Sequence, residues 1–438
     1  MSEPAAEQLQ VYRASLLHFT ADPALDENAT AWHEDGLLII SQGRVHAAGD
    51  YAALRATLPE GTLIHDYRGK LIMPGFIDTH IHYPQTDMIA SAAPGLLPWL
   101  ETYTFPTERR FFDPEHAREV ASFFLDELVR CGTTTAMVYC TVHPSSVEAF
   151  FTESEARNMR MVAGKVMMDQ HCPEFLRDTA ESSARDSEEL IKKWHKRGRQ
   201  LYAITPRFAA TSSEAQLQLA GELAATYPDT YVQTHLAENT EELAWIKSLY
   251  PTARSYLDVY DRHQLLRPRS MYAHCIWLDD TDRARMKATQ SAVAICATSN
   301  LFLGSGLFDF ARADAAQLHL SLGTDVGGGT SFSMLQTMNE AYKVARMGGT
   351  YLPALRMFYL ATLGAARSMQ LEGTIGNFVA GAEADFIVLD PRATPLLARR
   401  TARTNNLEEW LFVLALLGDD RAVAATYVAG KLAHEREG

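Results

Sequence analysis

The sequence predicts an α/β fold, a (β/α)8 TIM barrel with a small β-sandwich domain built from both chain ends. Apolar strand-sized runs alternate with helical patterns through the middle of the chain, and both ends are rich in short β-type runs. The length of 438 residues allows one large barrel plus something smaller. Hydrophobic residues make up 47% and charged residues 21%, which are globular values that exclude disordered and fibrous classes.

The middle region contains eight strand-sized runs that end in small or polar residues. They cover residues 75–80, 133–139, 161–168, 201–205, 231–235, 271–274, 292–297 and 318–324. Helical patterns lie between them at 115–130, 187–196, 214–226, 240–249 and 281–290. Eight parallel strands with intervening helices match a barrel, whose chemistry lies at the carboxyl ends of the strands. An open, doubly wound sheet is the alternative, which periodicity alone does not exclude.

Short β-rich runs separated by glycine and polar residues occupy both ends of the chain. They lie at 36–40, 43–49, 62–64, 71–73, 381–389 and 425–432. Such runs are typical of hairpins in an antiparallel sheet. We therefore expect the N-terminal part of the β-sandwich at 1–73 and the barrel at 74–370. Residues 371–438 are expected to supply the C-terminal part of the sandwich plus a terminal helix.

The charge balance excludes two classes of partner. The chain has 40 Lys and Arg against 54 Asp and Glu, which gives a formal net charge of −14. A nucleic acid or an anionic membrane surface requires a basic face, so we expect neither as a partner. The apolar runs are also shorter than the about 20 residues that a membrane span needs.

The cysteines and the N-terminus indicate the compartment. None of the five cysteines pairs with another at C-x-x-C spacing, so neither a disulfide framework nor a thiolate metal site is predicted. Residues 1–4 have neither the basic nor the apolar region of a signal peptide. We therefore expect a cytoplasmic protein.

Four histidines and one aspartate stand at the ends of predicted barrel strands. His80 and His82 close the first strand, and alternation along a strand directs both imidazoles to the same face. His235, His274 and Asp325 close the fifth, sixth and eighth strands. A lone histidine at such a position is more often a core residue, but five coinciding positions predict a metal site. Nitrogen and oxygen donors without a thiolate suit zinc or iron rather than calcium.

The sequence around these residues resembles the amidohydrolase superfamily. The motif His80-x-His82 follows the segment 74–79, PGFIDT, and the later strand-end residues extend the match over essentially the whole chain. Members that bind two metals commonly carry a bridging lysine or carboxylate at the fourth strand. This sequence has PRF at 206–208 instead. The resemblance therefore implies a site for one metal, as in the deaminase branch of the superfamily.

Six further segments sharpen this resemblance to the deaminase branch. They are 82–85 (HYPQ), 103–108 (YTFPTE), 206–208 (PRF), 235–239 (HLAEN), 298–301 (TSNL) and 323–330 (GTDVGGGT). In their order they are similar to enzymes of that branch that act on guanine. The resemblance implies hydrolytic deamination of guanine to xanthine and ammonia. It also implies one zinc ion per subunit, with Fe²⁺ as the alternative metal, and a homodimer.

The resemblance assigns roles around the metal. The implied metal ligands are His80, His82, His235, His274 and Asp325. His274 would be either a fifth ligand or a group hydrogen-bonded to the attacking water. Asp325 would accept a proton from that water. Glu238 would protonate ring nitrogen N3 and later give a proton to the leaving amine. Without the resemblance, the simpler interpretation of Glu238 is a carboxylate at a helix N-terminus that the helix dipole stabilises.

The resemblance also nominates residues that would contact the substrate. They are Gln85, Trp99, Arg207, Phe208, His235, Glu238 and Asp325. Guanine presents O6 and N7 as acceptors, which an arginine or a glutamine amide can satisfy. Its ring plane suits an aromatic partner, either Phe208 or Trp99. Without the resemblance, Arg207 is more simply a surface charge, and Trp99 could serve packing alone.

Two glycine-containing segments partly match motifs of other functions, a phosphate-binding loop and a serine hydrolase, which we do not assign. Gly327-Gly328-Gly329 lacks the lysine of a phosphate-binding loop, so we expect it to let the backbone approach the metal site. Gly304-Ser305-Gly306 lacks the G-x-S-x-G pattern of a serine hydrolase.

Two alternative functions remain open at this point. Another zinc amidohydrolase acting on 8-oxoguanine, a pterin or a triazine would carry the same metal ligands. A scaffold protein on a degenerate barrel belongs to a different class, and such a protein typically loses metal ligands. All five candidate ligands are present here.

Overall fold

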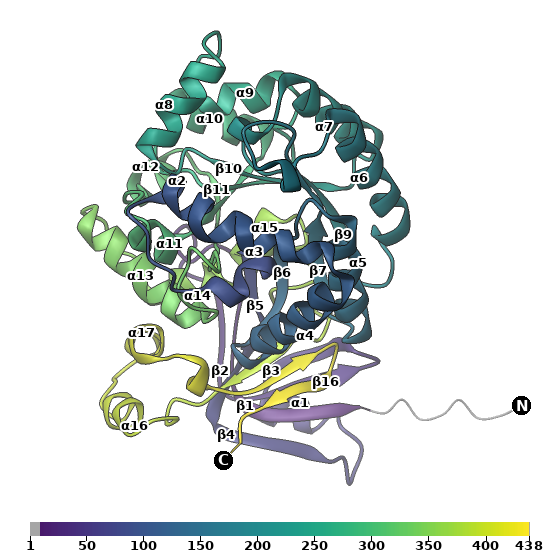
Figure 1. Ribbon diagram of the computed structural model, residues 1–438. Helices are drawn as coiled ribbons and strands as arrows, with labels where there is room; N and C mark the ends of the chain where they lie inside the picture. The colour runs from purple at the N-terminus through teal and green to yellow at the C-terminus, as the bar shows by residue number, and fades with distance from the viewer. Residues whose placement is uncertain (1–8, 438) are drawn as a thin grey trace, which may run out of the picture.

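The computed structural model describes residues 9–437 and shows two parts. Residues 1–8 and 438, which include the segment 1–4 used above to argue against a signal peptide, lie outside the described range. In Figure 1, helices surround the strands of the larger part, and purple and yellow strands from the two chain ends lie side by side below it. Among residues 9–437, no helix combines the length and apolar character needed to cross a lipid bilayer.

The larger part is a parallel barrel with the predicted strands in the predicted order. The strands are β5 (Phe76–His82), β6 (Thr133–Tyr139), β7 (Arg160–Gly164), β8 (Val166–Met167), β9 (Leu201–Pro206), β10 (Tyr231–Leu236), β11 (Ser270–His274), β12 (Ala292–Ile295) and β13 (His319–Leu322). Neighbours pair in parallel in the order β5-β6-β7-β9-β10-β11-β12-β13, with the short β8 also against β9. This order confirms the predicted barrel rather than an open, doubly wound sheet.

Contacts between the first and last strands nearly close the barrel. Thr79 on β5 shares a hydrogen bond of 2.8 Å with Ser321 on β13. Just beyond the strand ends, the Asp325 amide donates to the His80 carbonyl at 2.9 Å, and the His82 amide donates to the Val326 carbonyl at 2.8 Å. The closure therefore sets Asp325 beside the two histidines of β5.

Helices cover the outside of the barrel (Figure 1). They are α4 (Pro114–Arg130), α5 (Pro144–Ala156), α6 (Ala180–Trp194), α7 (Glu214–Thr226), α8 (Thr240–Leu249), α9 (Tyr256–Arg262), α10 (Asp280–Thr289), α11 (Ala297–Phe302), α12 (Phe310–Ala315), α13 (Met334–Met347), α14 (Ala354–Leu360) and α15 (Leu363–Ser368). Asn239 caps α8 by accepting from the Glu241 amide, so this helix begins directly behind the loop that carries Glu238. Two short helices, α2 (Leu96–Trp99) and α3 (Phe105–Arg109), follow β5.

The smaller part is a sheet made from both chain ends. Its strands are β1 (Gln10–Phe19), β2 (Thr30–Ser41), β3 (Arg44–Asp50), β4 (Ile64–Pro74), β14 (Phe386–Leu389), β15 (Val423–Val428) and β16 (Lys431–Glu435). Their order is β16-β15-β14-β4-β1-β2-β3, and every neighbouring pair except β1 and β4 is antiparallel. The Tyr12 ring on β1 lies 5.1 Å from the Tyr427 ring on β15, although two strands separate these in the sheet. The sheet therefore curls over its own core.

The helix expected at the C-terminus lies before the last two strands. This helix, α17 (Leu407–Leu417), follows α16 (Pro395–Thr401), and the fully buried β15 comes after it. Ala429 and Gly430 adopt positive φ angles of 46° and 74° in the turn to β16. Within residues 9–437, the last two elements are therefore a hairpin rather than a helix, because the apolar β15 pairs with β14 and β16.

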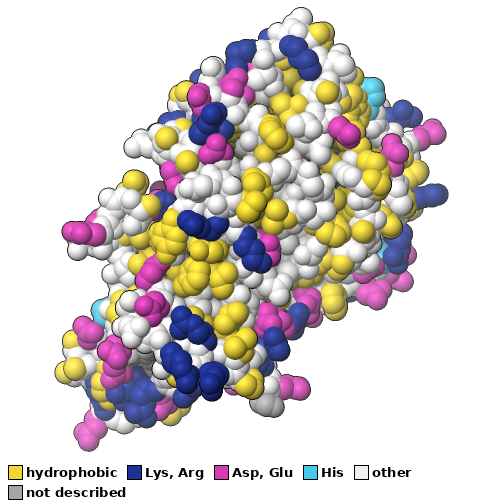
Figure 2. Space-filling model, turned by 90° about the vertical axis from the view of Figure 1, so that its left-hand side faces the viewer, with side chains coloured by type: hydrophobic (Ala, Val, Ile, Leu, Met, Phe, Trp, Pro, Cys, Tyr) yellow, Lys and Arg dark blue, Asp and Glu magenta, His cyan; other side chains and the backbone are white. Residues whose placement is uncertain are grey.

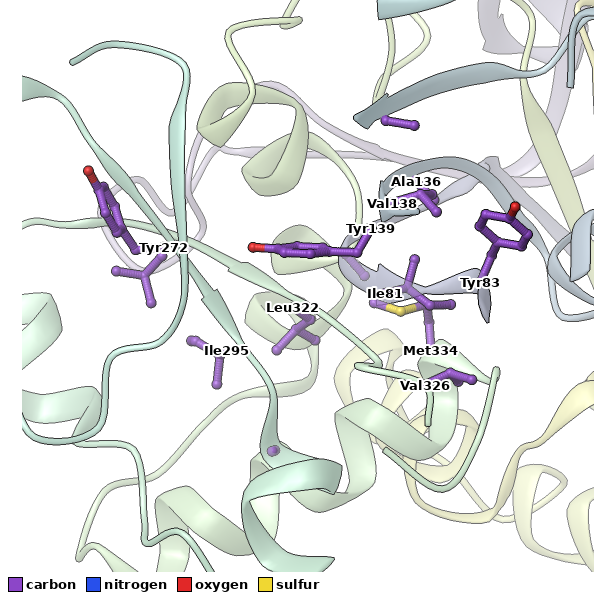
Figure 3. Packing of buried hydrophobic residues seen from close by; sticks show 14 of the residues in the cluster. Ile81, Tyr83, Ala136, Val138, Tyr139, Tyr272, Ile295, Leu322, Val326 and Met334 are labelled. Atoms are coloured by element: carbon purple, nitrogen blue, oxygen red, sulfur yellow. The ribbon is translucent and has the colours of Figure 1, made fainter. Parts of the chain in front are cut away.

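The core reaches up to the mouth of the barrel. Figure 3 shows Ile81, Tyr139 and Leu322 among the buried hydrophobic side chains of this region, and all three are fully buried. The Tyr139 ring contacts the rings of His80, His82 and His235 at centroid distances of 4.9, 4.4 and 4.9 Å. An apolar core thus supports the predicted metal site from one side, which restricts the rotamers of the histidines.

Candidate active site

The strand-end histidines and the aspartate meet at one point. The Nε2 atom of His82 lies 3.3 Å from that of His80 and 3.2 Å from that of His235. Asp325 Oδ1 lies 3.2 Å from His80 Nε2 and 3.3 Å from His82 Nε2. One donor atom from each of these four residues lies within 4.8 Å of all the others. The structure thus brings together residues from β5, β10 and the loop after β13.

Backbone geometry just past the strands aims two of these side chains. His274 and Asp325 have positive φ angles of 69° and 54°, which bulky side chains rarely adopt. Asp78 on β5 holds the last turn before Asp325, because its carboxylate accepts hydrogen bonds from the Thr324 amide and hydroxyl. The strained position of Asp325 is therefore held by hydrogen bonds to the residue before it, as is common at functional sites.

Hydrogen bonds behind two of the imidazoles fix their tautomers. His235 Nδ1 lies 2.7 Å from the Arg207 carbonyl, and a carbonyl can only accept, so Nδ1 carries the hydrogen. His274 Nδ1 lies 2.8 Å from Asn300 Oδ1 and donates in the same way. Each Nε2 is left with a lone pair directed into the site, which is how histidine ligands of metals are usually held.

The protonation states suit metal binding. Burial lowers the pKa of His82 to about 3, and burial together with the neighbouring histidines lowers that of His235 well below its usual value. Burial would raise the pKa of Asp325, but His80 and His82 hold it well below its usual range. Neutral imidazoles and an ionised carboxylate are the forms that coordinate metals.

The donor set fits a divalent transition metal. His274 Nε2 is buried and has no hydrogen-bond partner within the described part of the chain, and His82 Nε2 lies 3.3 Å from His80 Nε2 and 3.2 Å from His235 Nε2. Facing nitrogen lone pairs without hydrogens between them are costly to bury unless a cation satisfies them. A second group of donor atoms, which was not predicted, consists of His80, His274, Cys296 and Asp325. Burial raises the pKa of Cys296 well above its usual value, so we assign the nitrogen and oxygen set.

Glu238 lies beside this cluster in the loop between β10 and α8. Its Oε2 lies 3.4 Å from His274 Nε2, which is itself 3.7 Å from Asp325 Oδ2. The Ser305 hydroxyl donates to Glu238 Oε1 at 2.9 Å. Burial and the charge of Asp325 raise the pKa of Glu238 to about 8. A buried carboxyl that keeps its proton at neutral pH is suited to general acid chemistry.

A second buried glutamate holds the Glu238 loop. Glu242 Oε2 accepts hydrogen bonds from the amides of Glu238 and Asn239 at 2.9 and 3.2 Å, and its Oε1 accepts from the Tyr256 hydroxyl at 2.9 Å. The backbone of Glu238 is therefore fixed from behind, and the residue is more than an exposed helix-terminal carboxylate.

A single cavity joins these residues to the predicted substrate-binding residues. Its lining comprises His82, Gln85, Leu96, Trp99, Leu100, Arg207, Phe208, His235, Glu238, Glu242, His274, Leu303, Asp325 and Gly328. The glycine segment after Asp325 allows this close packing: a Cβ at Gly327 would lie 2.7 Å from the Gln85 carbonyl, and one at Gly328 would lie 2.7 Å from Ser299 Oγ.

The interpretation of Arg207 as a surface charge is wrong, since only 3% of its surface is exposed. Its guanidinium forms an ion pair of 2.7 Å with Glu108, a buried residue that we did not predict. Trp99 is buried as well, and its indole N–H donates to the Ser91 carbonyl at 2.9 Å, so it both packs and lines the cavity.

Several residues that hold the site were not predicted. Glu108, Glu242, Asn300 and Ser305 were not nominated, although 103–108 and 298–301 were among the quoted segments. Ser305 lies in a segment set aside for lacking a hydrolase motif, and it contacts Glu238 across 67 positions of sequence. A buried arginine requires a carboxylate partner, but Glu108 lies 99 positions away from Arg207, so no short sequence motif identifies it as that partner.

The fold and the site define a class of protein. A parallel (β/α)8 barrel with a histidine and aspartate donor group at the carboxyl ends of its strands is typical of a metal-dependent barrel enzyme. The sequence pattern of the Amidohydrolase family matches residues 71–433. The chain belongs to the amidohydrolase family, which confirms the resemblance drawn from its motifs.

Individual relatives narrow the comparison. The guanine deaminase of Escherichia coli (strain K12) is 51% identical over 431 residues, which cover 98% of this chain and 98% of that protein. The solved structure of E. coli guanine deaminase gives a TM-score of 0.94 at 50% identity and covers 98% of this chain and 99% of that chain. A guanine deaminase from C. acetobutylicum with bound guanine in the active site gives a TM-score of 0.86 at 27% identity, covering 97% and 99% of the two chains.

Proposed function

We propose that this chain hydrolyses guanine to xanthine and ammonia. The cavity that joins Glu238, the donor cluster and the Arg207 side chain carries the proposal. It is supported by the E. coli guanine deaminase, which is 51% identical over 98% of the chain. The alternative of a non-catalytic scaffold finds no support in a site that retains all of its candidate ligands.

The metal ligands in this proposal are His80, His82, His235 and Asp325, with His274 as a fifth ligand or a partner of the attacking water. We propose zinc as the metal, with Fe²⁺ as the alternative, because the donors are nitrogen and oxygen. Bound there, zinc would supply Lewis acidity and lower the pKa of water to about 7.

Two carboxyl groups move the protons of the reaction. Asp325 takes one proton as the water oxygen attacks C2, and Glu238 gives its proton to N3. Glu238 then takes the proton of the new C2 hydroxyl and passes it to the amine, so that the C2–N bond breaks and ammonia leaves. The proton on Asp325 returns to Glu238 before the next turnover. His274 lies 3.4 Å from Glu238 and 3.7 Å from Asp325, within reach of this return transfer.

The remaining lining residues bind the purine. Gln85 and Arg207 supply N–H donors for O6 and N7 of guanine. Phe208 and Trp99 border the same cavity and offer ring faces for stacking. His235, Glu238 and Asp325 contact the side of the ring that carries C2, where the reaction takes place.

We also propose that the enzyme is a cytoplasmic homodimer. Figure 2 shows hydrophobic side chains gathered into a patch beside Lys and Arg on one face of the molecule. Patches of this kind often mark protein–protein contacts. Sedimentation velocity over a range of protein concentrations would test the dimer, and a monomer at all concentrations would contradict it.

The proposed function predicts a selective activity. Purified protein should release ammonia from guanine and form xanthine, which absorbance and ammonia assays on the same sample would measure. The panel should include 8-oxoguanine, a pterin and the triazine ammeline. Ammonia release from one of these, with guanine untouched, would replace guanine as the substrate.

Metal removal should abolish this activity reversibly. Dialysis against a chelator is expected to remove one metal ion per chain and all measurable turnover, and added Zn²⁺ should restore both. Circular dichroism of the chelated protein would show that the fold is intact. Full activity in protein free of metal would contradict the proposed ligand cluster.

A further inference from the structure

A buried carboxylate joins the two side chains that we assign to the purine edge. Glu108 near the end of α3 is completely buried. Its carboxylate accepts hydrogen bonds from Arg207 Nη1 at 2.7 Å, from Arg207 Nη2 at 3.0 Å and from Gln85 Nε2 at 3.1 Å. A paired fork of this kind holds a guanidinium in one plane and one orientation.

The same network fixes the orientation of the Gln85 amide. Gln85 Oε1 accepts from the Gly327 amide at 3.1 Å, and Nε2 donates to Glu108. The flipped amide would set an NH₂ group against a backbone N–H and an oxygen against a carboxylate, so the observed orientation is the only one that satisfies both partners. The remaining Nε2 hydrogen of Gln85 is free to serve the cavity that this residue lines.

The contacts of Glu108 also determine which hydrogen-bonding groups Gln85 and Arg207 present to the cavity. Within residues 9–437, Arg207 forms no salt bridge with any other carboxylate. With the Glu108 oxygens occupied by Arg207 and Gln85, the hydrogens left over on these two residues are donors. A ring with an acceptor at C6, such as a 6-oxopurine, can accept hydrogen bonds from these donors. A 6-amino group is itself a donor and would face the N–H groups without forming a hydrogen bond.

We propose that Glu108 is a positioning residue that makes the site selective for an oxygen at C6 of the purine ring. This inference rests on the proposed function, because it assumes that Gln85 and Arg207 face that edge of the base. Sites built around a hydrogen bond to the substrate discriminate strongly against analogues that lack it, because buried polar groups are then left unpaired.

Binding of two unreactive purines tests the proposal without relying on catalysis. Hypoxanthine keeps O6 and lacks the C2 amino group, and unsubstituted purine lacks both. In titration calorimetry with zinc-loaded protein, the wild type should bind hypoxanthine more tightly than purine. Glu108→Gln is expected to weaken hypoxanthine binding at least 10-fold and purine binding less than 3-fold, because one of the two carboxylate oxygens becomes an NH₂ group, which cannot accept and opposes an N–H of Arg207 or Gln85. In turnover, KM for guanine should rise more than kcat falls.

Two further variants separate positioning from general damage. Glu153→Gln alters a carboxylate that also accepts from two arginines, Arg118 and Arg157, outside the cavity, and it should leave both affinities unchanged. Glu108→Asp keeps the buried charge if the glutamine variant fails to fold, and its shorter reach should still lower the preference for hypoxanthine at least 3-fold.

The outcomes are distinguishable. An equal loss of affinity for both ligands, or an unchanged preference for hypoxanthine in the folded Glu108 variants, would overturn the positioning role. If wild-type protein binds hypoxanthine selectively but leaves guanine unchanged, the proposed reaction fails while the role of Glu108 stands.

Discussion

Glu238→Gln should lower kcat for guanine at least about 100-fold while leaving the metal content unchanged. The glutamine amide keeps the size of the side chain and can still accept from Ser305, but it has no acidic proton to deliver to N3. Glu238 Oε2 lies 3.4 Å from His274 Nε2, and Glu238 does not belong to the group of described residues that could hold the metal. The loss should therefore be confined to chemistry.

Stopped-time xanthine assays and metal analysis on the same preparation would measure both effects. Glu241→Gln is a matched control, since Glu241 is an exposed carboxylate three positions farther along the chain, and it should leave kcat within twofold. A Glu238→Gln enzyme with the wild-type rate would remove the general acid from the proposal. Loss of metal from this variant would assign Glu238 a structural role instead.

The dependence of kcat on pH should also reveal the role of Glu238 as a proton donor. Burial and the charge of Asp325 raise the pKa of Glu238 from 4.5 to about 8, so the protonated form persists to neutral pH and is lost as pH rises. Because a nearby cation would favour the charged form and lower this pKa, kcat should fall on the alkaline side of a midpoint at or below about pH 8. The Glu238→Gln variant should lack this fall.

The barrel and the donor cluster could be predicted because both depend on local pattern. Runs of strand length were visible in sequence, and the carboxyl ends of parallel barrel strands converge by geometry. His80 and His82 share a face through the alternation of one strand. Asp325 then joins them because β13 lies next to β5 at the closure of the barrel.

The pairs that hold the site could not be predicted in this way. Glu108 and Arg207 are 99 positions apart, and the segment carrying Glu108 is a short helix outside the repeating pattern of strand and helix. Charged residues are rarely buried without a partner, so the residues alone favour an exposed Arg207, and only the family resemblance places it at the substrate. Specific partnerships between distant loops depend on how the barrel mouth is packed, which periodicity does not encode.

His235→Ala should remove both the metal and the activity. His235 is the cluster residue supplied by β10, and its Nε2 lies 3.2 Å from that of His82, while its Nδ1 is held by the Arg207 carbonyl. The substitution deletes one of four converging donors and leaves a gap between β5 and the residues proposed to bind the purine. We expect metal content below about one tenth of the wild-type level, because losing a ligand costs more than the 10–100-fold in affinity typical of outer-shell partners.

Metal analysis after gel filtration, with activity assayed on the same fractions, would test this assignment. His46→Ala serves as the control, because His46 is exposed on β3 of the smaller sheet, and it should retain both metal and turnover. Full metal retention by His235→Ala would show that the other donors suffice, and the cluster that includes Cys296 would then become the better assignment. Loss of metal together with an unchanged circular dichroism spectrum would assign the effect to coordination, since a folding defect would alter both.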